Sequence, residues 1–434
     1  MRVLVTGAYG LIGAACLARL HAEGHELVAA GRSIEEASRR FPYARWVAAD
    51  FNEFTHADDW LPLLTLANVD ALVNCVGVLQ DGARDDTRRV HVEATGALFD
   101  ACVKAGVRRV VHISAIVAEA DGASAFARTK AEADAHLRTL DLDWIVLRPA
   151  LVLAPAAYGG TAMLRGLAGF PLATPVPEGT GPIQIVSVDD LTATIAFALG
   201  PRASGRVTWD LAHPQNHALG DIVAALRQWL GLPTGRTLRV PGFALDIVCA
   251  LGDLAGRLGW RSPARSNAVA QLRAGIAGAP EAWIASTGIK PQSLADILAA
   301  RSSGVQERWF ARLFLLKPLL IGGLALFWIV SGLIALGPGW PAAIAILEGA
   351  GFSIGLARAS ALAAALLDVA LGAALIRRAF ARPALIAMLC VTALHLAMAT
   401  ILTPHLWGDP LGPLVKTLPL VLATLAALAI LDER

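Results

Sequence analysis

Residues 2–13 read Arg-Val-Leu-Val-Thr-Gly-Ala-Tyr-Gly-Leu-Ile-Gly, and this stretch decides the fold of the N-terminal part of the chain. Its apolar start predicts a buried parallel strand, and the pattern that follows predicts a helix. Between the two, Gly7 permits a tight turn, Gly10 lets a pyrophosphate approach the backbone, and Gly13 lets the helix pack on the strand. Because the first turn of a helix offers unpaired N–H groups to anions, the stretch predicts a dinucleotide site.

Further apolar runs, at residues 26–30, 45–49, 71–75, 110–113 and 144–147, alternate with helical patterns. This alternation predicts an α/β fold with a doubly wound parallel sheet, a Rossmann domain, whose ligand lies at the carboxyl ends of the strands. Small or polar residues stand at those ends. We therefore expect these residues to bind the cofactor: Thr6, Gly7, Tyr9, Gly10, Leu11, Ile12, Gly13, Arg32, Ser33, Asp50, Phe51, Cys75, Val76, Gly77, Ser114 and Pro149.

The residues after the second strand bear on the choice between NADP(H) and NAD(H). A site for NAD usually places an acidic side chain there, which binds the ribose 2′-hydroxyl. The sequence instead has Arg32, which can pair with a 2′-phosphate, and Ser33, which can add a hydrogen bond. We expect NADP(H) to be favoured over NAD(H), although a solvated Arg32 and a role for Glu35 stay open.

Several motifs together resemble the short-chain dehydrogenase/reductase superfamily: Thr6-Gly7-x-x-Gly10-x-x-Gly13, Asp50, Asn74-x-x-Gly77, Ser114, Lys130 and Arg148-Pro149. The similarity is to its extended and atypical branches, which include an NADPH-binding accessory subunit of respiratory complex I, and it covers about residues 1–300. The stretch Val186-Ser-Val-Asp189-Asp190-Leu191 resembles one that precedes the substrate region in those branches. Residues 310–432 resemble the DoxX-like four-helix membrane family, with weaker motifs.

The superfamily uses a Tyr-x-x-x-Lys pair, in which tyrosine transfers the proton and lysine binds the nicotinamide ribose. The matching stretch is Phe126-Ala-Arg-Thr-Lys130, whose spacing places both side chains on one face of a helix. The resemblance therefore implies that Lys130 binds the cofactor ribose. Phe126 has no hydroxyl group and cannot transfer a proton, so the resemblance does not supply the usual acid–base residue.

Three interpretations of this departure remain. Ser114 can help to orient a carbonyl group, although an unassisted serine is a weak acid. Tyr158 can approach the nicotinamide from the substrate side, or it can be an ordinary loop residue. Alternatively, the site binds NADP(H) without turnover. The candidate catalytic residues are therefore Ser114, Lys130 and Tyr158, with Phe126 at the usual tyrosine position.

The composition changes along the chain. Only 12 of the 121 residues from 314 to 434 are Asp, Glu, Lys or Arg, against 60 of the 313 that precede them. Four apolar runs follow one another there, at residues 318–347, 359–376, 383–402 and 414–431, and a helix needs about 20 apolar residues to cross a bilayer. The last part therefore predicts an all-α four-helix transmembrane domain.

Lysine and arginine placement predicts the orientation of these spans. Basic residues precede the first span (Arg308, Arg312 and Lys317) and lie between the second and third (Arg377, Arg378 and Arg382), whereas the opposite side has only Arg358 and Lys416. We expect a multi-pass protein of a bacterial-type inner membrane. Its Rossmann domain and both termini would face the cytoplasm.

Other classes are disfavoured. A net charge of +2, from 37 basic and 35 acidic residues, gives no basic bias for nucleic acid. The five cysteines are scattered without a CxxC pair, which argues against a zinc site or a disulfide framework, and we expect no metal.

The sequence thus predicts three parts: an NAD(P)-binding Rossmann core at residues 1–150, a substrate-side lobe and connection at 151–312, and a DoxX-like transmembrane domain at 313–434. The favoured function is a membrane-anchored NAD(P)H-dependent oxidoreductase acting on a lipophilic substrate, quinone-like or isoprenoid-like. The alternative is a non-catalytic NADPH-binding scaffold or redox-sensing subunit of a membrane assembly. The expected partners are the lipid bilayer, a small lipophilic molecule and, as an open option, a membrane protein.

Overall fold

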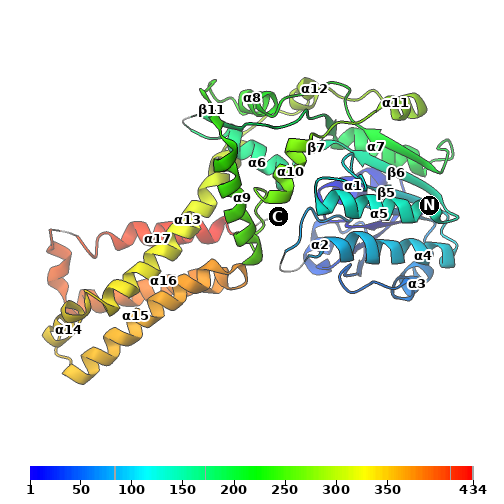
Figure 1. Cartoon of the computed structure of the whole chain (residues 1–434). Helices are drawn as coiled ribbons and strands as arrows, with labels where there is room; N and C mark the ends of the chain where they lie inside the picture. The colour runs from blue at the N-terminus through cyan, green and yellow to red at the C-terminus, as the bar shows by residue number, and fades with distance from the viewer. Residues whose placement is uncertain (83–84, 172, 411, 433–434) are drawn as a thin grey trace. The chain divides into compact units, whose positions relative to one another are not determined.

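A computed structural model describes residues 1–82, 85–171, 173–410 and 412–432 (Figure 1). The chain divides into two compact units. One contains residues 1–254 and 262–311, and the other contains residues 255–261 and 312–434. We call them the nucleotide unit and the membrane unit and describe each by itself.

The nucleotide unit is built around a parallel sheet of seven strands in the order β10-β6-β5-β4-β1-β2-β3. The strand order reverses beside β1, which is the arrangement of a doubly wound sheet. Each apolar run expected to form a strand does so within a few residues, and a seventh strand, β10, extends the edge beside β6. The strands are β1 (Arg2–Thr6), β2 (Glu26–Gly31), β3 (Arg45–Ala48), β4 (Ala71–Asn74), β5 (Arg109–Ile113), β6 (Asp143–Pro149) and β10 (Val207–Leu211).

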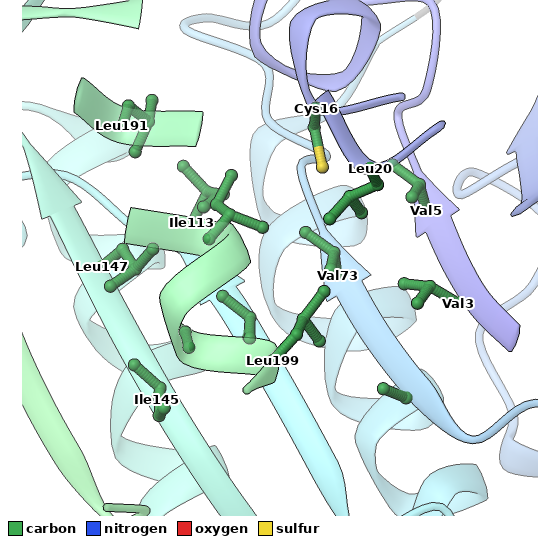
Figure 2. Packing of buried hydrophobic residues seen from close by; sticks show 14 of the residues in the cluster. Val3, Val5, Cys16, Leu20, Val73, Ile113, Ile145, Leu147, Leu191 and Leu199 are labelled. Carbon is green, nitrogen blue, oxygen red and sulfur yellow. The ribbon is translucent and has the colours of Figure 1, made fainter. Parts of the chain in front are cut away.

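Helices cover both faces of this sheet because alternate strand residues point to opposite sides. On one face, Cys16 and Leu20 of α1 and Leu191 of α7 pack over Val73 and Ile113, as Figure 2 shows. On the other face, α3, α4 and α5 enclose a second apolar core. The helices are α1 (Leu11–Ala22), α2 (Ile34–Arg40), α3 (Ala57–Leu66), α4 (Thr95–Ala105), α5 (Ala125–Thr139) and α7 (Val188–Leu199), with a π-helical turn, η1 (Arg89–Ala94), before α4.

A smaller lobe follows the sheet in sequence. Two parallel strand pairs, β7 (Leu151–Leu153) with β9 (Ile185–Ser187) and β8 (Thr174–Pro177) with β11 (Thr237–Val240), connect to helices that share one apolar core. These helices are α6 (Gly159–Ala168), α8 (Leu219–Trp229) and α12 (Leu294–Ala299). The remaining helices of this region are α9 (Gly242–Arg257), α10 (Ser266–Ala274) and α11 (Glu281–Thr287).

Among the described residues, three helices are long and apolar enough to cross a membrane: α13 (Val305–Leu336), α15 (Ile354–Ile376) and α16 (Arg378–Leu402). The expected first span is divided, because α13 ends at Leu336 and a short helix, α14 (Trp340–Gly349), follows. The expected fourth span is also shorter than predicted. Its helix, α17 (Thr417–Ala429), has 13 residues, or about 20 Å, against about 30 Å of hydrocarbon, and a short 3₁₀ helix, η2 (Pro404–Gly408), precedes it.

Small residues set the contact between α13 and α15. A Cβ atom on Gly332 would lie 2.5 Å from the carbonyl oxygen of Ala365, and one on Gly372 would lie 2.7 Å from that of Ala325. Such close backbone approach is how helices pack where lipid removes the hydrophobic driving force. The first two spans, α13 and α15, therefore meet at glycine and alanine positions.

Candidate functional site

The glycine turn after β1 has no room for a side chain at Gly7 or at Gly13. Gly7 adopts a φ of +63°, and a Cβ atom there would lie 2.9 Å from the backbone of Cys75. A Cβ atom on Gly13 would lie 2.2 Å from the carbonyl oxygen of Gly7. Both glycines are thus required by the close contact between the turn, the end of β4 and α1.

The start of α1 has the donors that a pyrophosphate needs. Gly10 is the N-cap residue, and the first backbone hydrogen bond of the helix runs from Ala14 N to Gly10 O at 2.9 Å. The amides of Leu11, Ile12 and Gly13 precede that bond, and the first turn holds no acidic residue. This cradle fits the diphosphate of a nicotinamide dinucleotide, whose negative charge suits a helix N-terminus.

Tyr9 and Arg32 lie together at the carboxyl end of β2. The Tyr9 ring covers Gly31, where a Cβ atom would lie 2.3 Å from Tyr9 Cε1, and Tyr9 Oη accepts a hydrogen bond from Arg32 N at 3.2 Å. The Arg32 guanidinium lies 2.8 Å from Asp85 Oδ1. Burial by itself would lower the pKa of Arg32, but the charges of Asp85 and Asp50 outweigh it and the pKa is raised. Arg32 is therefore a strong cation that already has an acidic neighbour.

Three other residues expected near the adenosine serve the local structure. Ser33 is the N-cap residue of α2. Asp50 Oδ1 accepts hydrogen bonds from Asn52 N and Nδ2, at 2.9 and 3.1 Å. The Phe51 ring packs against Trp60 with centroids 4.7 Å apart, within the core. Phe51 therefore turns its side chain inward, which leaves its backbone as the part that can contact a ligand.

Lys130 is buried where β4 and β5 end. Its Nζ donates to Val76 O at 3.0 Å and to Ile113 O at 2.8 Å, so two of its three hydrogens are used. A Cβ atom on Gly77 would lie 3.4 Å from this nitrogen, so the glycine leaves space beside the ammonium group. Burial lowers the pKa of Lys130 to about 8, against the opposing charges of Asp134 and Cys75.

His91, which the sequence analysis did not single out, lies beside Lys130 and Phe126. Its Nε2 accepts from Val78 N at 3.0 Å, and its Nδ1 lies 2.9 Å from Thr129 Oγ1. Burial and the charge of Lys130 lower its pKa well below the ordinary value, so the ring is neutral and donates from Nδ1. The Phe126 ring meets the His91 ring edge-on, 5.5 Å between centroids. His91 thus holds the loop that follows β4.

A buried polar network lies behind Lys130, and two of its members, His112 and Asp134, were not singled out from the sequence. Asn74 Oδ1 accepts from Thr6 Oγ1 at 2.6 Å, and Asn74 Nδ2 lies 3.2 Å from His112 Nδ1. Asp134 is fully buried one helical turn after Lys130, and its Oδ2 accepts two hydrogen bonds from Arg148, at 2.9 and 3.1 Å. The i, i+4 spacing from Lys130 was the available signal for Asp134.

The remaining candidates are placed as follows. Ser114 is buried directly after β5, and its hydroxyl forms no hydrogen bond of standard geometry with a described residue. Pro149 ends β6, and its carbonyl accepts from Ile116 N. Tyr158 is the N-cap residue of α6, outside the seven-stranded sheet, and its side chain is exposed. The structure thus gathers Ser114, Lys130 and Phe126 near the ends of β4 and β5, with Tyr158 on the lobe.

Comparison with known proteins identifies relatives of the nucleotide unit. An NAD(P)H-binding family model matches residues 7–168. The 3-diazoavenalumate denitrifying reductase of a Streptomyces species is 31% identical over 276 residues, which are 55% of this chain and 84% of that protein. The chain belongs to the same family as this reductase and contains an NAD(P)H-binding domain. An uncharacterised protein of Mycobacterium tuberculosis is 24% identical over 247 residues, and the match spans only 25% of its length.

Solved structures of low sequence identity share the fold of the nucleotide unit. MoeE5 in complex with UDP-glucuronic acid and NAD has a TM-score of 0.51 and 20% identity, over 72% of this chain and 99% of that one. The Bordetella bronchiseptica enzyme WbmG in complex with NAD and UDP has a TM-score of 0.54 and 15% identity, over 69% and 93%.

The membrane unit has its own family. A DoxX-like family model matches residues 325–425, which include the C-terminal part of α13 and all of α14, α15 and α16. The chain therefore joins an NAD(P)H-binding, oxidoreductase-like domain to a DoxX-like membrane domain.

Proposed function

We propose that this protein is a membrane-anchored NAD(P)H-dependent reductase whose substrate is a lipophilic, quinone-like or isoprenoid-like molecule. The observation that carries the proposal is the buried Lys130 ammonium at the ends of β4 and β5, with Gly77 leaving space beside it. A lysine held there can bind the nicotinamide ribose with its third hydrogen. The DoxX-like unit supports a substrate that resides in lipid.

The bound cofactor would supply the hydride, and the residues of the chain would position it. The glycine turn and the first amides of α1 bind the diphosphate, while Lys130 orients the ribose. Asn74 and His91 fix the loop after β4, because each accepts a hydrogen bond from a backbone amide of that loop. The Lys130 side chain and the Asn74–His112 pair are buried from solvent.

The reaction must accommodate a phenylalanine where an acid is usual. A hydride acceptor whose oxygens take protons from solvent, such as a quinone, does not need a protein acid at Phe126. The Streptomyces relative supports this reading, since its name assigns reduction of a diazo compound rather than of a carbonyl.

Cofactor preference and orientation are part of the same proposal. Arg32 would bind the 2′-phosphate of NADP(H) in exchange for Asp85.

The orientation of the membrane unit has its own support. Lys317 Nζ donates to the carbonyls of Leu431 and Asp432, and Arg378 donates to Leu431 O. Basic residues therefore gather at the end that carries the C-terminus, which favours a cytoplasmic location for it.

The decisive experiment uses the full chain in nanodiscs. NADPH and NADH binding is measured by fluorescence, and oxidation is followed with a panel of short-chain quinones and apolar carbonyls. We expect quinone-dependent oxidation that is lost in Lys130→Met and retained in Lys104→Met, an exposed lysine paired with Asp58. Tight binding without turnover across the panel would refute the reductase.

Tight binding without turnover would instead indicate the rival function, a non-catalytic NADPH-binding subunit. The lack of a hydroxyl group at Phe126 favours this rival. In it, the nucleotide unit binds NADPH without turnover and reports the redox state to a membrane assembly. The rival predicts that nucleotide binding changes hydrogen exchange in the membrane unit while no acceptor is reduced.

A further inference from the structure

Helix α9 carries an exposed apolar stripe. Phe243, Ile247, Leu251 and Leu254 are 70%, 58%, 62% and 52% exposed, respectively. Their spacing of four, four and three residues places them on one face of the helix. A helix of a soluble domain normally turns such a face toward the core. The stripe therefore needs an apolar environment from outside the nucleotide unit.

The contacts of the opposite face fix the direction of this stripe. Cys249 is buried, and a Cβ atom on Gly252 would lie 1.8 Å from the carbonyl oxygen of Ala264. Both acidic residues of the helix are paired with neighbouring arginines, Asp246 with Arg273 at 2.8 Å and Asp253 with Arg265 at 2.9 Å. Because these contacts hold the inner face and its flank, the helix cannot rotate to bury the stripe.

The C-terminal end of α9 leads into the membrane unit. Residues 255–261 belong to that unit. Trp260 Nε1 donates to the carbonyl of Ile376, the last residue of α15, at 2.7 Å, and Leu258 O accepts from Arg378 N, the first residue of α16, at 3.0 Å. The Arg378 guanidinium also lies over the Trp260 ring. The junction of two membrane-crossing helices lies at a membrane surface, so the end of α9 lies there too.

The charge around α9 suits an anionic surface. Its two acidic residues are neutralised by the ion pairs above, whereas further arginines lie before the helix, at its last residue and after it. These are Arg236, Arg239, Arg257 and Arg261, all exposed. A helix with an apolar stripe and basic flanks binds in the plane of a bilayer, with attraction to anionic lipid headgroups.

We propose that α9 lies in the interfacial layer of the bilayer, with its apolar stripe among the acyl chains and the flanking arginines on anionic phospholipid headgroups. The nucleotide unit then has a lipid contact of its own, in addition to the spans of the membrane unit. This proposal does not depend on whether the protein reduces a substrate.

Photocrosslinking of the full chain tests which occupant covers the stripe. A p-benzoylphenylalanine is placed at Leu251 or, as a control, at Leu66, which is 79% exposed at the end of α3. In nanodiscs of phosphatidylcholine and phosphatidylglycerol, we expect lipid adducts at Leu251 and none at Leu66. Adducts to a second copy or to another protein, or no lipid adduct at Leu251, would overturn the proposal.

Hydrogen exchange tests the role of the arginines. We expect the amides of α9 to be more protected in discs that contain phosphatidylglycerol than in discs of phosphatidylcholine alone. The difference should disappear in the double variant Arg239→Gln, Arg257→Gln and persist in Arg45→Gln, an exposed arginine on β3. Equal protection of the wild-type helix in both lipids would exclude headgroup binding.

Discussion

The ammonium nitrogen of Lys130 lies 2.8 Å from the carbonyl oxygen of Ile113. A second bond, to Val76, makes this lysine the link between the ends of β4 and β5, which are neighbours in the sheet. One buried cation thus shapes the edge of the sheet where the nicotinamide would bind, and its protonation state determines what it can hold.

Cofactor affinity should depend on pH through Lys130. Because the pKa of this lysine is lowered to about 8, its ammonium group loses a proton in mildly alkaline solution. We expect the affinity for NADPH to be highest below that pH and to fall above it, by up to about tenfold per pH unit. Lys130→Arg keeps its charge throughout and should flatten the profile. Fluorescence titrations from neutral to alkaline pH test this, and a wild-type profile matching that of the arginine variant would count against it.

Removing the charge of Asp134 should destabilise the nucleotide unit. This carboxylate is fully buried and accepts both hydrogen bonds of Arg148 at its Oδ2. Asp134→Asn would leave the arginine without its counter-charge, and breaking a buried pair costs about 3 kcal/mol or more. The control is Asp141→Asn, an exposed partner of Arg108, which should change little. Chemical denaturation followed by circular dichroism would show the difference, and equal losses in the two variants would exclude the explanation.

The glycine cradle should not tolerate a methyl group. Gly13→Ala places a Cβ atom 2.2 Å from the Gly7 carbonyl oxygen, so the turn must move and the phosphate donors move with it. We expect binding of NADPH and of NADH to weaken at least about tenfold. Gly160→Ala, where a Cβ atom would meet no atom of the described residues within 4 Å, should bind as the wild type does. Unchanged affinity in Gly13→Ala would place the nucleotide elsewhere.

The pair of Arg32 and Asp85 should set the choice of cofactor. Arg32→Ala removes the cation that would meet a 2′-phosphate, and we expect NADPH binding to weaken about tenfold while NADH binding stays the same. Asp85→Asn removes the competing charge and should strengthen NADPH binding alone. Parallel titrations with both nucleotides measure the ratio. A loss of equal size for NADH would mean that Arg32 has no part in discriminating between them.

A hydroxyl group restored at position 126 should give the protein carbonyl reductase activity. Phe126→Tyr places a phenol one helical turn before Lys130, and a general acid contributes about a hundredfold or more to such reactions. We expect the variant to reduce apolar carbonyl compounds that the wild type leaves untouched, with little effect on quinone reduction. Turnover of NADPH with each class is the measurement. A variant that binds NADPH and stays inactive toward carbonyls would show that the surrounding groups are not arranged for this chemistry.

Much of the fold was predictable because the buried strands leave a direct trace in the sequence. A parallel strand covered on both faces is a short, continuous apolar run, as at residues 71–74, and the polar or small residue that ends it marks the ligand edge. The roles of His91 and His112 left no such trace. Each depends on which residues of distant elements meet in the core, and a single buried histidine gives no sign of its partners.

For the membrane spans, the sequence predicts the apolar runs better than it predicts where each helix begins and ends. Composition identified the apolar runs, but the ends of the helices depend on local breaks. The run from residue 318 is divided at Gly337-Pro338-Gly339, where a proline without an N–H group ends the helical ladder. The last run begins with hydrogen-bonded turns before α17 starts at Thr417, which shortens the helix below the length of the apolar stretch.

Strand β10 extends the sheet and helix α7 packs beside α1 on one of its faces. This has a practical consequence for the choice of a fragment to express. Both elements follow residue 150, yet α7 lies against α1 and β10 pairs along β6 from Val207 to Leu211. A fragment that stops at residue 150 would leave β6 as a bare, apolar edge and strip one side of α1, which invites aggregation. A fragment that contains the whole nucleotide unit must therefore extend to about residue 311, the last residue of that unit.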